Sequence, residues 1–246
     1  MGDVTADVIA FEQVTCSFEN QTVLRDVSFR VAPRETKVII GASGSGKTTI
    51  LRLLLGLLKP QAGRILIEGQ EISGLDEESL IVLRRKIGMV FQEGALFDSM
   101  TVGENVGYRL FEEGQLSESE IEDRVSHLLG FVGLGETIDM MPDELSGGMK
   151  RRVAIMRALA AVDARIMLYD EPTTGLDPIT ARTICDLIRR LRDAQGVTSV
   201  VVTHQMADAF RVGDRFLAIH DGQVVFEGTA EELRQCKDEH VRGFLV

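Results

Sequence analysis

The stretch GASGSGKTT, residues 41–49, constrains the fold of this chain more than any other. It matches the pattern G-x-x-x-x-G-K-[ST] and stands between KVII, typical of a strand, and TILRLLLGLL, typical of a helix. Glycines let backbone N–H groups turn inward around phosphate oxygens, and the helix start adds partial positive charge. An ordinary Gly/Ser turn is disfavoured because both flanking segments fit the pattern. The sequence therefore predicts a strand, a phosphate-binding loop and a helix.

Two side chains of this loop have separate predicted roles. Lys47 can reach the β- and γ-phosphates of a nucleotide, and the Thr48 hydroxyl can ligate Mg²⁺. A nucleotide with Mg²⁺ is therefore the expected cofactor. The predicted nucleotide contacts of the loop are Gly41, Ala42, Ser43, Gly44, Ser45, Gly46, Lys47, Thr48 and Thr49.

Composition excludes several classes of protein. The chain has 246 residues, of which 44% are hydrophobic and 26% charged, as in a globular protein with a sizeable core. Its net charge of −11 argues against nucleic acid as a partner, because a phosphate backbone needs a basic face. No apolar run reaches the roughly 18–20 residues that span a bilayer. The three cysteines are far apart in the sequence, so a reducing cytosol is the expected compartment.

The chain is expected to form one domain, residues 1–246, in three parts. Residues 1–92 are rich in strands, with one helix after the phosphate loop. Residues 93–160 are mostly helical and inserted, and Ser117 and Glu120 have the spacing of a capping box. Residues 161–246 alternate strands with helices, one of them capped by Asp177. This alternation predicts a mostly parallel sheet with helices on both faces.

An acidic pair follows the apolar segment RIMLY. The segment places Asp170 at the carboxyl end of a buried strand, where ligands bind in open α/β sheets. Asp170 there can hold the Mg²⁺ shell, and Glu171 can orient and deprotonate an attacking water. A surface acidic pair is the alternative, and the preceding phosphate loop disfavours it.

Three further residues are weaker candidates. His204 ends the strand VTSVVVTH, whose end should face the same crevice as Asp170, so its imidazole can bind a γ-phosphate or the water. Gln92 follows the apolar IGMVF and can contact Mg²⁺ or water from a loop. Phe18 can stack on an adenine ring, but its spacing alone favours a core phenylalanine. The other histidines, His127, His220 and His240, receive no functional role.

A second glycine-containing helix start lies in DELSGGMKRR, residues 143–152. Basic residues follow its two glycines, and positive charge in a first helical turn opposes the helix dipole. An anion bound at this helix start would remove the conflict. The sequence thus predicts a second anion-binding element about a hundred residues after the first.

Taken in order, Phe18, GASGSGKTT, Gln92, LSGGM, IMLYDEPTTGLDP and VVTH resemble the nucleotide-binding domain of ABC transporters. The resemblance extends from about residue 8 to 235. It implies a P-loop NTPase: a RecA-like, mostly parallel sheet with an N-terminal antiparallel β-subdomain and an inserted α-helical subdomain. ATP and Mg²⁺ are the implied cofactors.

The resemblance also assigns residue roles. Phe18 is similar to the aromatic that stacks on adenine. Glu171 is similar to the catalytic glutamate, His204 to the switch histidine and Gln92 to the Q-loop residue. The implied magnesium contacts are Thr48, Gln92 and Asp170. The implied contacts with the nucleotide of a partner subunit are Leu145, Ser146, Gly147, Gly148, Met149 and Asp177.

Met149 stands where the family usually has Gln, and the segment GALF follows Gln92. These two features point to one group within the family. These features resemble the ATPases of Mla-type and related Mce-associated lipid transporters. That resemblance implies a homodimer under an MlaE-like permease, at the cytoplasmic face of the inner membrane. It further implies a STAS-domain protein and a periplasmic MCE-domain protein as possible partners, and phospholipid as cargo.

Two other functions remain open from the sequence. One is an ATPase subunit for another substrate, such as an amino acid or other small molecule. The other is an ABC-type ATPase that does not act in membrane transport. The single set of motifs and the net negative charge disfavour this second function.

Overall fold

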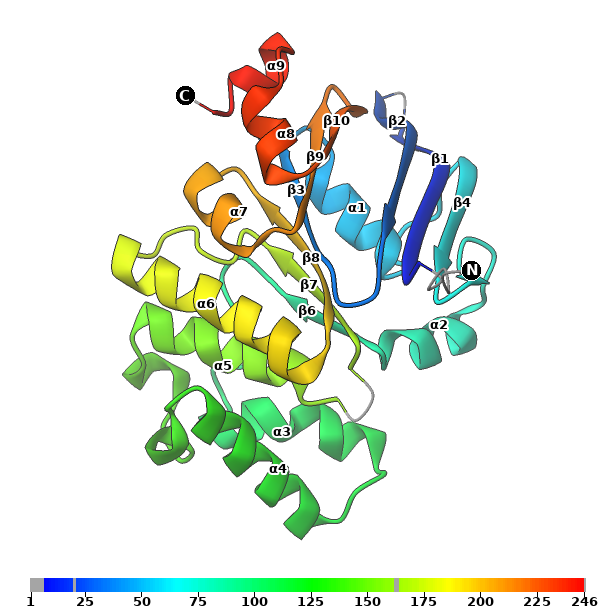
Figure 1. The fold of residues 1–246 in the computed structure, drawn as a ribbon. Helices are drawn as coiled ribbons and strands as arrows, with labels where there is room; N and C mark the ends of the chain where they lie inside the picture. The colour runs from blue at the N-terminus through cyan, green and yellow to red at the C-terminus, as the bar shows by residue number, and fades with distance from the viewer. Residues whose placement is uncertain (1–6, 20, 162–163, 246) are drawn as a thin grey trace, which may run out of the picture.

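The computed structural model describes residues 7–19, 21–161 and 164–245. The ends of the predicted 1–246 domain thus lie partly outside the described residues. In Figure 1 the strands lie in the upper part of the molecule, and the helices of the middle of the sequence, coloured green, extend below them.

The larger sheet is mostly parallel, as predicted. Its strand order is β10-β9-β3-β8-β7-β6, and only the edge strand β10 runs antiparallel to its neighbour. The parallel order brings the carboxyl ends of β3, β7 and β8 to one edge, where the predicted site residues follow. The strands are β3 Thr36–Gly41, β6 Ile87–Val90, β7 Ile166–Asp170, β8 Thr198–Thr203, β9 Arg215–His220 and β10 Gln223–Gly228.

The smaller sheet is antiparallel and comes from the first part of the chain, which confirms the predicted β-subdomain. Its order is β2-β1-β4-β5. Its strands are β1 Ile9–Phe18, β2 Gln21–Val31, β4 Ala62–Ile67 and β5 Gln70–Glu71.

Apolar side chains on both faces of β3 hold the layers together. Ile39 packs into the core that contains helix α1 (Lys47–Leu54) and the antiparallel sheet. Val38 and Ile40 point to the opposite core, formed with α6 (Pro178–Gln195) and α7 (Met206–Val212). This strand is fully buried, so the phosphate loop that follows it starts from a fixed point.

The middle of the chain is helical, as predicted. It contains α3 (Val102–Glu113), α4 (Glu118–Phe131) and α5 (Gly147–Leu159), with 3-10 turns at Gly135–Thr137 and Pro142–Glu144. The predicted capping box at the start of α4 is present: Ser117 accepts from the Glu120 N–H, and Glu120 bonds the Ser117 N–H. Buried residues such as Val106, Val125 and Ile155 join these helices to the core on the α6 side of the sheet.

Helix α2 (Glu77–Arg84) corrects the prediction of a single helix before residue 92. Asp76 caps it, but only Leu80 and Leu83 are buried while Ile81 and Val82 are exposed, which blurs the helical pattern of the sequence. At the other end, α8 (Ala230–Gln235) was expected, and the short α9 (Glu239–Arg242) was not. In the described part of the chain, no helix has the length and apolarity that crossing a membrane requires.

Candidate nucleotide-binding site

The loop of residues 41–49 links β3 to α1, as predicted, and its glycines are needed where they stand. Gly44 and Gly46 have φ values of 80° and 102°, in the left-handed region that favours glycine. A Cβ on Gly41 would lie 2.5 Å from Ser45 Oγ and 2.6 Å from the Ile219 carbonyl oxygen. The loop is therefore tightly wound, with the Ser45 hydroxyl buried and without a partner among the described residues.

Lys47 lies at the start of α1 and is only 7% exposed. Its Nζ donates to the carbonyl oxygens of Gly41 and Ala42, at 2.8 and 2.9 Å. Burial lowers the pKa of this ammonium, while the charges of Glu171 and Asp170 oppose the shift. No carboxylate in the described ranges lies within ion-pair distance of it, so the cation is available to an anion in the pocket.

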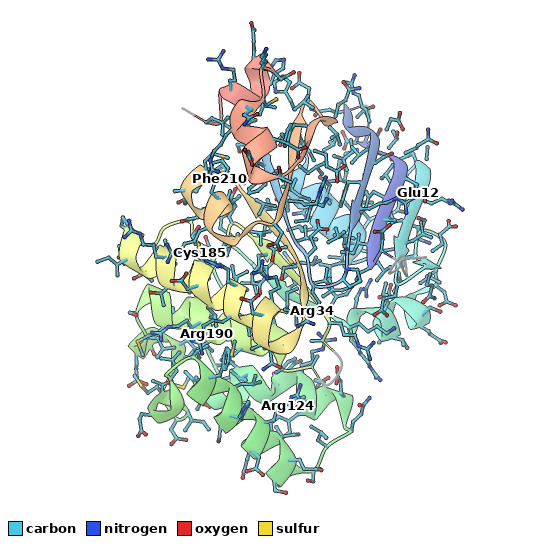
Figure 2. The ribbon with its side chains drawn as sticks, viewed as in Figure 1. Glu12, Arg34, Arg124, Cys185, Arg190 and Phe210 are labelled. Carbon is cyan, nitrogen blue, oxygen red and sulfur yellow. The ribbon has the colours of Figure 1, made fainter. Side chains whose placement is uncertain are left out.

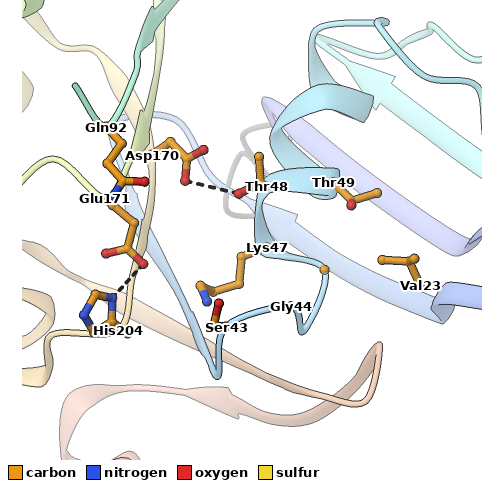
Figure 3. Close-up of a pocket in the computed structure, with 11 residues that line it drawn as sticks. Val23, Ser43, Gly44, Lys47, Thr48, Thr49, Gln92, Asp170, Glu171 and His204 are labelled. Atoms are coloured by element: carbon orange, nitrogen blue, oxygen red, sulfur yellow. Dashed lines mark hydrogen bonds and ion pairs between the residues drawn. The ribbon is translucent and has the colours of Figure 1, made fainter. Parts of the chain in front are cut away.

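Thr48 and Asp170 meet across the site, as the dashed line in Figure 3 shows. Thr48 Oγ1 donates to Asp170 Oδ1 over 3.4 Å, a long contact that leaves both oxygens open to a further ligand. Burial raises the pKa of Asp170, and the Thr48 hydrogen bond opposes that shift. A hydroxyl, a carboxylate and the nearby Gln92 amide are oxygen donors of the type that Mg²⁺ prefers. The donor set therefore fits a magnesium ion.

Glu171 is held by both of its carboxylate oxygens. His204 Nδ1 lies 2.9 Å from Oε1, and the Thr174 hydroxyl donates to Oε2 over 3.1 Å. Its backbone has a φ of 50°, which a non-glycine residue rarely adopts and which often marks a functional position. The side chain of Glu171 is 12% exposed and that of His204 55%, so the histidine lies toward the opening.

These residues line one cavity of about 440 Å³, within the size range of small-molecule sites. The cavity brings together loop residues from β3–α1, Gln92 after β6, the acidic pair at the end of β7 and His204 after β8 (Figure 3). Its lining is Val23, Ser43, Gly44, Gly46, Lys47, Thr48, Thr49, Gln92, Asp170, Glu171 and His204.

The aromatic candidate lies elsewhere. Phe18 ends β1, is 39% exposed and does not line the cavity. Val23 on β2 does line it, and the sequence analysis missed this residue. Its neighbour Leu24 packs against the loop, since a Cβ on Gly46 would lie 2.6 Å from Leu24 Cδ2. An isolated valine in a strand has no sequence signal that marks it as a pocket residue.

The second glycine element opens helix α5, as predicted, but lies away from this cavity. The Ser146 hydroxyl caps the helix by accepting from the Met149 N–H at 3.3 Å. Ser146 and Gly147 are exposed, whereas Leu145 is buried and Met149 packs against the core. None of the residues 145–149 is among those that line the cavity of their own chain.

Two of the three basic residues after Met149, Arg151 and Arg152, have a different explanation from the one expected. Arg151 donates to the carbonyl oxygens of Phe91 and Thr174, and Arg152 donates to that of Val132. Both side chains therefore have partners within the chain, and neither requires an anion at the helix start. Asp177 caps α6, as predicted, by accepting from the Ile179 and Thr180 N–H groups, and the bonds with Thr180 lower its pKa.

Comparison with known proteins identifies the family. The family model described as ABC transporter matches residues 24–174, which include the phosphate loop, the glycine element and the acidic pair. The chain belongs to the ABC transporter family. It is an ATPase of that family, with ATP and Mg²⁺ as cofactors.

Several relatives are similar over most of the chain. Protein TRIGALACTOSYLDIACYLGLYCEROL 3 of Arabidopsis thaliana chloroplasts is 40% identical over 97% of this chain and 73% of its own length. The intermembrane phospholipid transport system ATP-binding protein MlaF of Haemophilus influenzae is 38% identical over 97% of this chain and 90% of its own length. The methionine import ATP-binding protein MetN 1 of Rhodococcus jostii is 42% identical over 89% of this chain and 63% of its own length.

Solved structures have the same fold. The ATP-binding cassette MJ0796, described as a dimer in a post-hydrolysis state with ADP and phosphate, matches with a TM-score of 0.80 and 35% identity. The match covers 90% of this chain and 98% of the cassette. The predicted fold class is thereby confirmed.

Proposed function

We propose that this ATPase powers phospholipid transport between an inner and an outer membrane. The observation that carries the proposal is the similarity to MlaF, which covers 97% of this chain and 90% of that relative and so extends well beyond the nucleotide motifs. The similarity to MetN 1 covers only 63% of the length of that relative. A small-molecule importer, for example of an amino acid, is therefore the second candidate.

In the proposed mechanism the phosphates of ATP lie in the loop of residues 41–49. The inward-facing backbone N–H groups and the start of α1 bind phosphate oxygens, and Lys47 adds a full positive charge. Thr48, Asp170 and Gln92 would hold Mg²⁺, whose charge offsets that of the β- and γ-phosphate oxygens. Phe18 remains the proposed adenine contact, from outside the cavity of the single chain.

Glu171 is the proposed general base. An ionised carboxylate only accepts hydrogen bonds, so in the contact with Glu171 the Nδ1 atom of His204 carries the proton. His204 and Thr174 then hold the carboxylate in one orientation, and Glu171 can take a proton from the water that attacks the γ-phosphate. His204 also lines the cavity and is more exposed than Glu171, so it is the proposed contact for the γ-phosphate.

Two copies of the chain are proposed to enclose two ATP molecules. Residues 145–149 do not line the cavity of their own chain, yet Ser146 and Gly147 are exposed at the start of a thirteen-residue helix. In a two-fold dimer this helix start can face the γ-phosphate held by the partner. Asp177 is the proposed second contact. The MJ0796 cassette, 35% identical, is itself dimeric.

A membrane permease is the proposed second partner. A groove of about 500 Å³ runs between α2, β6 and α3, and exposed Ile81, Phe91 and Tyr108 line it. Charged side chains line the same groove, namely Arg84, Arg85, Arg109, Glu112, Glu113 and Arg157. The groove therefore fits a partner segment that has both apolar and charged side chains. An MlaE-like permease would hold the subunit at the cytoplasmic face of the inner membrane. A STAS-domain protein and a periplasmic MCE-domain protein complete the proposed system, and the charge of −11 disfavours nucleic acid.

Purification of the tagged chain from its native membranes in mild detergent tests the proposal. The phospholipid hypothesis expects a multi-span permease that carries bound phospholipid, identified by mass spectrometry of the protein and the extracted lipid. Recovery of a permease together with an amino-acid-binding protein, and no enriched phospholipid, would favour the importer instead.

A further inference from the structure

Arg151 lies on helix α5, five residues after Ser146, and is only 6% exposed. Within the described ranges no carboxylate lies at ion-pair distance from its guanidinium. Burial lowers the pKa of Arg151, and the more distant charge of Glu93 opposes the shift only in part. A buried cation costs free energy unless its hydrogen bonds are satisfied, so the partners of this side chain indicate why it is there.

The first partner is the turn that carries Gln92. The Phe91 carbonyl oxygen accepts the Gly94 N–H at 2.9 Å, which closes a turn over residues 91–94, and it also accepts from Arg151 Nη1 at 2.8 Å. Gly94 is buried against the same helix, since a Cβ there would lie 3.5 Å from Ala154 Cβ. Arg151 therefore fixes the turn in which Gln92 enters the cavity.

The second partner is the turn that carries Glu171. The Thr174 N–H donates to the Glu171 carbonyl over 3.2 Å, and the Thr174 hydroxyl donates to the Glu171 carboxylate over 3.1 Å. The carbonyl of Thr174 in turn accepts from Arg151 Nη2 over 3.4 Å. One guanidinium thus binds two turns that each bring a residue to the cavity, Gln92 and Glu171. A planar group with a fixed fork of donors suits this geometry.

We propose that Arg151 is a positioning residue for ATP hydrolysis: it couples the turns of Gln92 and Glu171 to the helix that begins at Ser146. Five residues of α-helix separate Ser146 and Arg151 by about 7.5 Å, so a movement of the helix start toward a phosphate displaces the guanidinium as well. When the site closes, Arg151 would then move the turns of Glu171 and Gln92 as one unit, so that both side chains take their places at the nucleotide at the same time. This inference rests on the proposed roles of Glu171 and Gln92.

The test compares Arg151→Ala and Arg151→Lys with a matched control. Arg124, labelled on α4 in Figure 2, also donates to two backbone carbonyls, those of Ala160 and Ala161, both at 2.9 Å. It is not among the residues that line the nucleotide cavity. Arg124→Ala therefore also removes two bonds from a guanidinium to backbone carbonyls, here from a half-buried side chain, without touching the site. For each full-length variant, kcat, KM, the Kd for Mg-ATP and the Tm are measured, with and without added guanidinium ion at millimolar concentration.

The expected result for Arg151→Ala is a fall in kcat of roughly 10-fold or more, with the Kd for Mg-ATP within about threefold of wild type. Guanidinium should restore part of kcat in Arg151→Ala and none in Arg124→Ala. Arg151→Lys should lose nearly as much kcat, because an ammonium cannot span both turns. Two outcomes would overturn the inference. The first is an unchanged kcat in Arg151→Ala. The second is a lowered kcat in Arg151→Ala that guanidinium does not restore, with a Tm loss equal to that of Arg124→Ala.

Glu171→Gln, measured in the same assay, separates this inference from the proposed function. If Glu171→Gln abolishes turnover while Arg151→Ala does not lower it, the base assignment stands and the positioning role of Arg151 is wrong. If Glu171→Gln keeps wild-type turnover, the base assignment and the inference built on it both fail.

Discussion

Nδ1 of His204 lies 2.9 Å from Oε1 of Glu171, and this contact joins the ends of two adjacent parallel strands. The residues are 33 positions apart in the sequence. The Thr174 hydroxyl binds the other carboxylate oxygen, so Glu171 has little freedom to rotate. A carboxylate fixed in this way, opposite Lys47 and beside Asp170, is placed to accept a proton from a water in the cavity.

Glu171→Gln should bind Mg-ATP with near-normal affinity and hydrolyse it far more slowly. The amide cannot accept a proton, and a general base contributes roughly 10²–10⁴-fold to rate. Because ATP then persists, an ATP-stabilised dimer should accumulate. Phosphate release and size-exclusion chromatography in Mg-ATP measure the two effects. Wild-type turnover in this variant would place the base elsewhere.

Thr174→Val should lower kcat by about 10-fold and lower the free energy of unfolding by about 1.5 kcal/mol. Valine keeps the volume of the side chain but removes the hydroxyl that donates to Glu171, and such a hydrogen bond to a charged group contributes about 1.5 kcal/mol or more. Thr174→Ser is the matched control, since it keeps the hydroxyl and should keep most of the activity. Equal activities of the two variants would mean that this bond does not orient the base.

Lys47→Ala should lose nucleotide binding, or at least turnover, while the fold survives. The nucleotide-free contacts of Lys47 are two carbonyls of its own loop, so its removal leaves no buried carboxylate unpaired. Equilibrium binding of a fluorescent ATP analogue and a thermal melt of the free protein test both parts. Normal ATPase activity would contradict the role of residues 41–49.

Asp170→Asn should abolish Mg²⁺-dependent hydrolysis yet raise the Tm of the nucleotide-free protein near neutral pH. Burial raises the folded-state pKa of Asp170, so the ionised form is disfavoured in the folded state and its cost is present above that pKa. The amide removes this cost. As pH falls through the pKa of Asp170, the wild type gains protons and the Tm difference should shrink. A lower Tm at every pH would contradict the burial argument.

The nucleotide motifs were predictable from the sequence because each one depends on residues close together in the chain. Gly44 and Gly46 have φ values that few other residues adopt, and a strand that ends in Asp170 places that side chain at the sheet edge. The parallel sheet then brings Asp170, Glu171 and His204 to one cavity, as the strand–helix alternation implied.

Other features depend on contacts that local patterns do not encode. Val23 lines the cavity because β2 folds back beside the phosphate loop, a placement set by the pairing of β1 with β2. From the sequence, Arg151 would be expected on the solvent-exposed face of a helix. In the structure it is buried, and it binds carbonyl groups of two turns that are far from it in the sequence. Helix α2 was missed because its exposed Ile81 and Val82 break the expected amphipathic pattern.

A disulfide between two copies tests the proposed use of the second glycine element. Ser43 lies in the phosphate loop and Ser146 at the start of α5, and both are exposed. In the proposed dimer the two meet across the interface. The variant Ser43→Cys/Ser146→Cys is made in a chain whose own cysteines are replaced by alanine: buried Cys16 and Cys185 and half-buried Cys236. Glu171→Gln is added so that Mg-ATP holds the closed state.

Mild oxidation in Mg-ATP should then give a covalent dimer on a non-reducing gel, since a disulfide forms only when the two Cα atoms lie within about 7 Å. Each single-cysteine chain serves as a control and should give little dimer. Adding Lys47→Ala should remove the dimer band, because without bound γ-phosphate the helix start has no anion to face. A disulfide confined to single chains would mean that Ser146 approaches the phosphate loop of its own chain. In that case the trans arrangement of DELSGGMKRR is wrong, although the nucleotide site of residues 41–49 would stand.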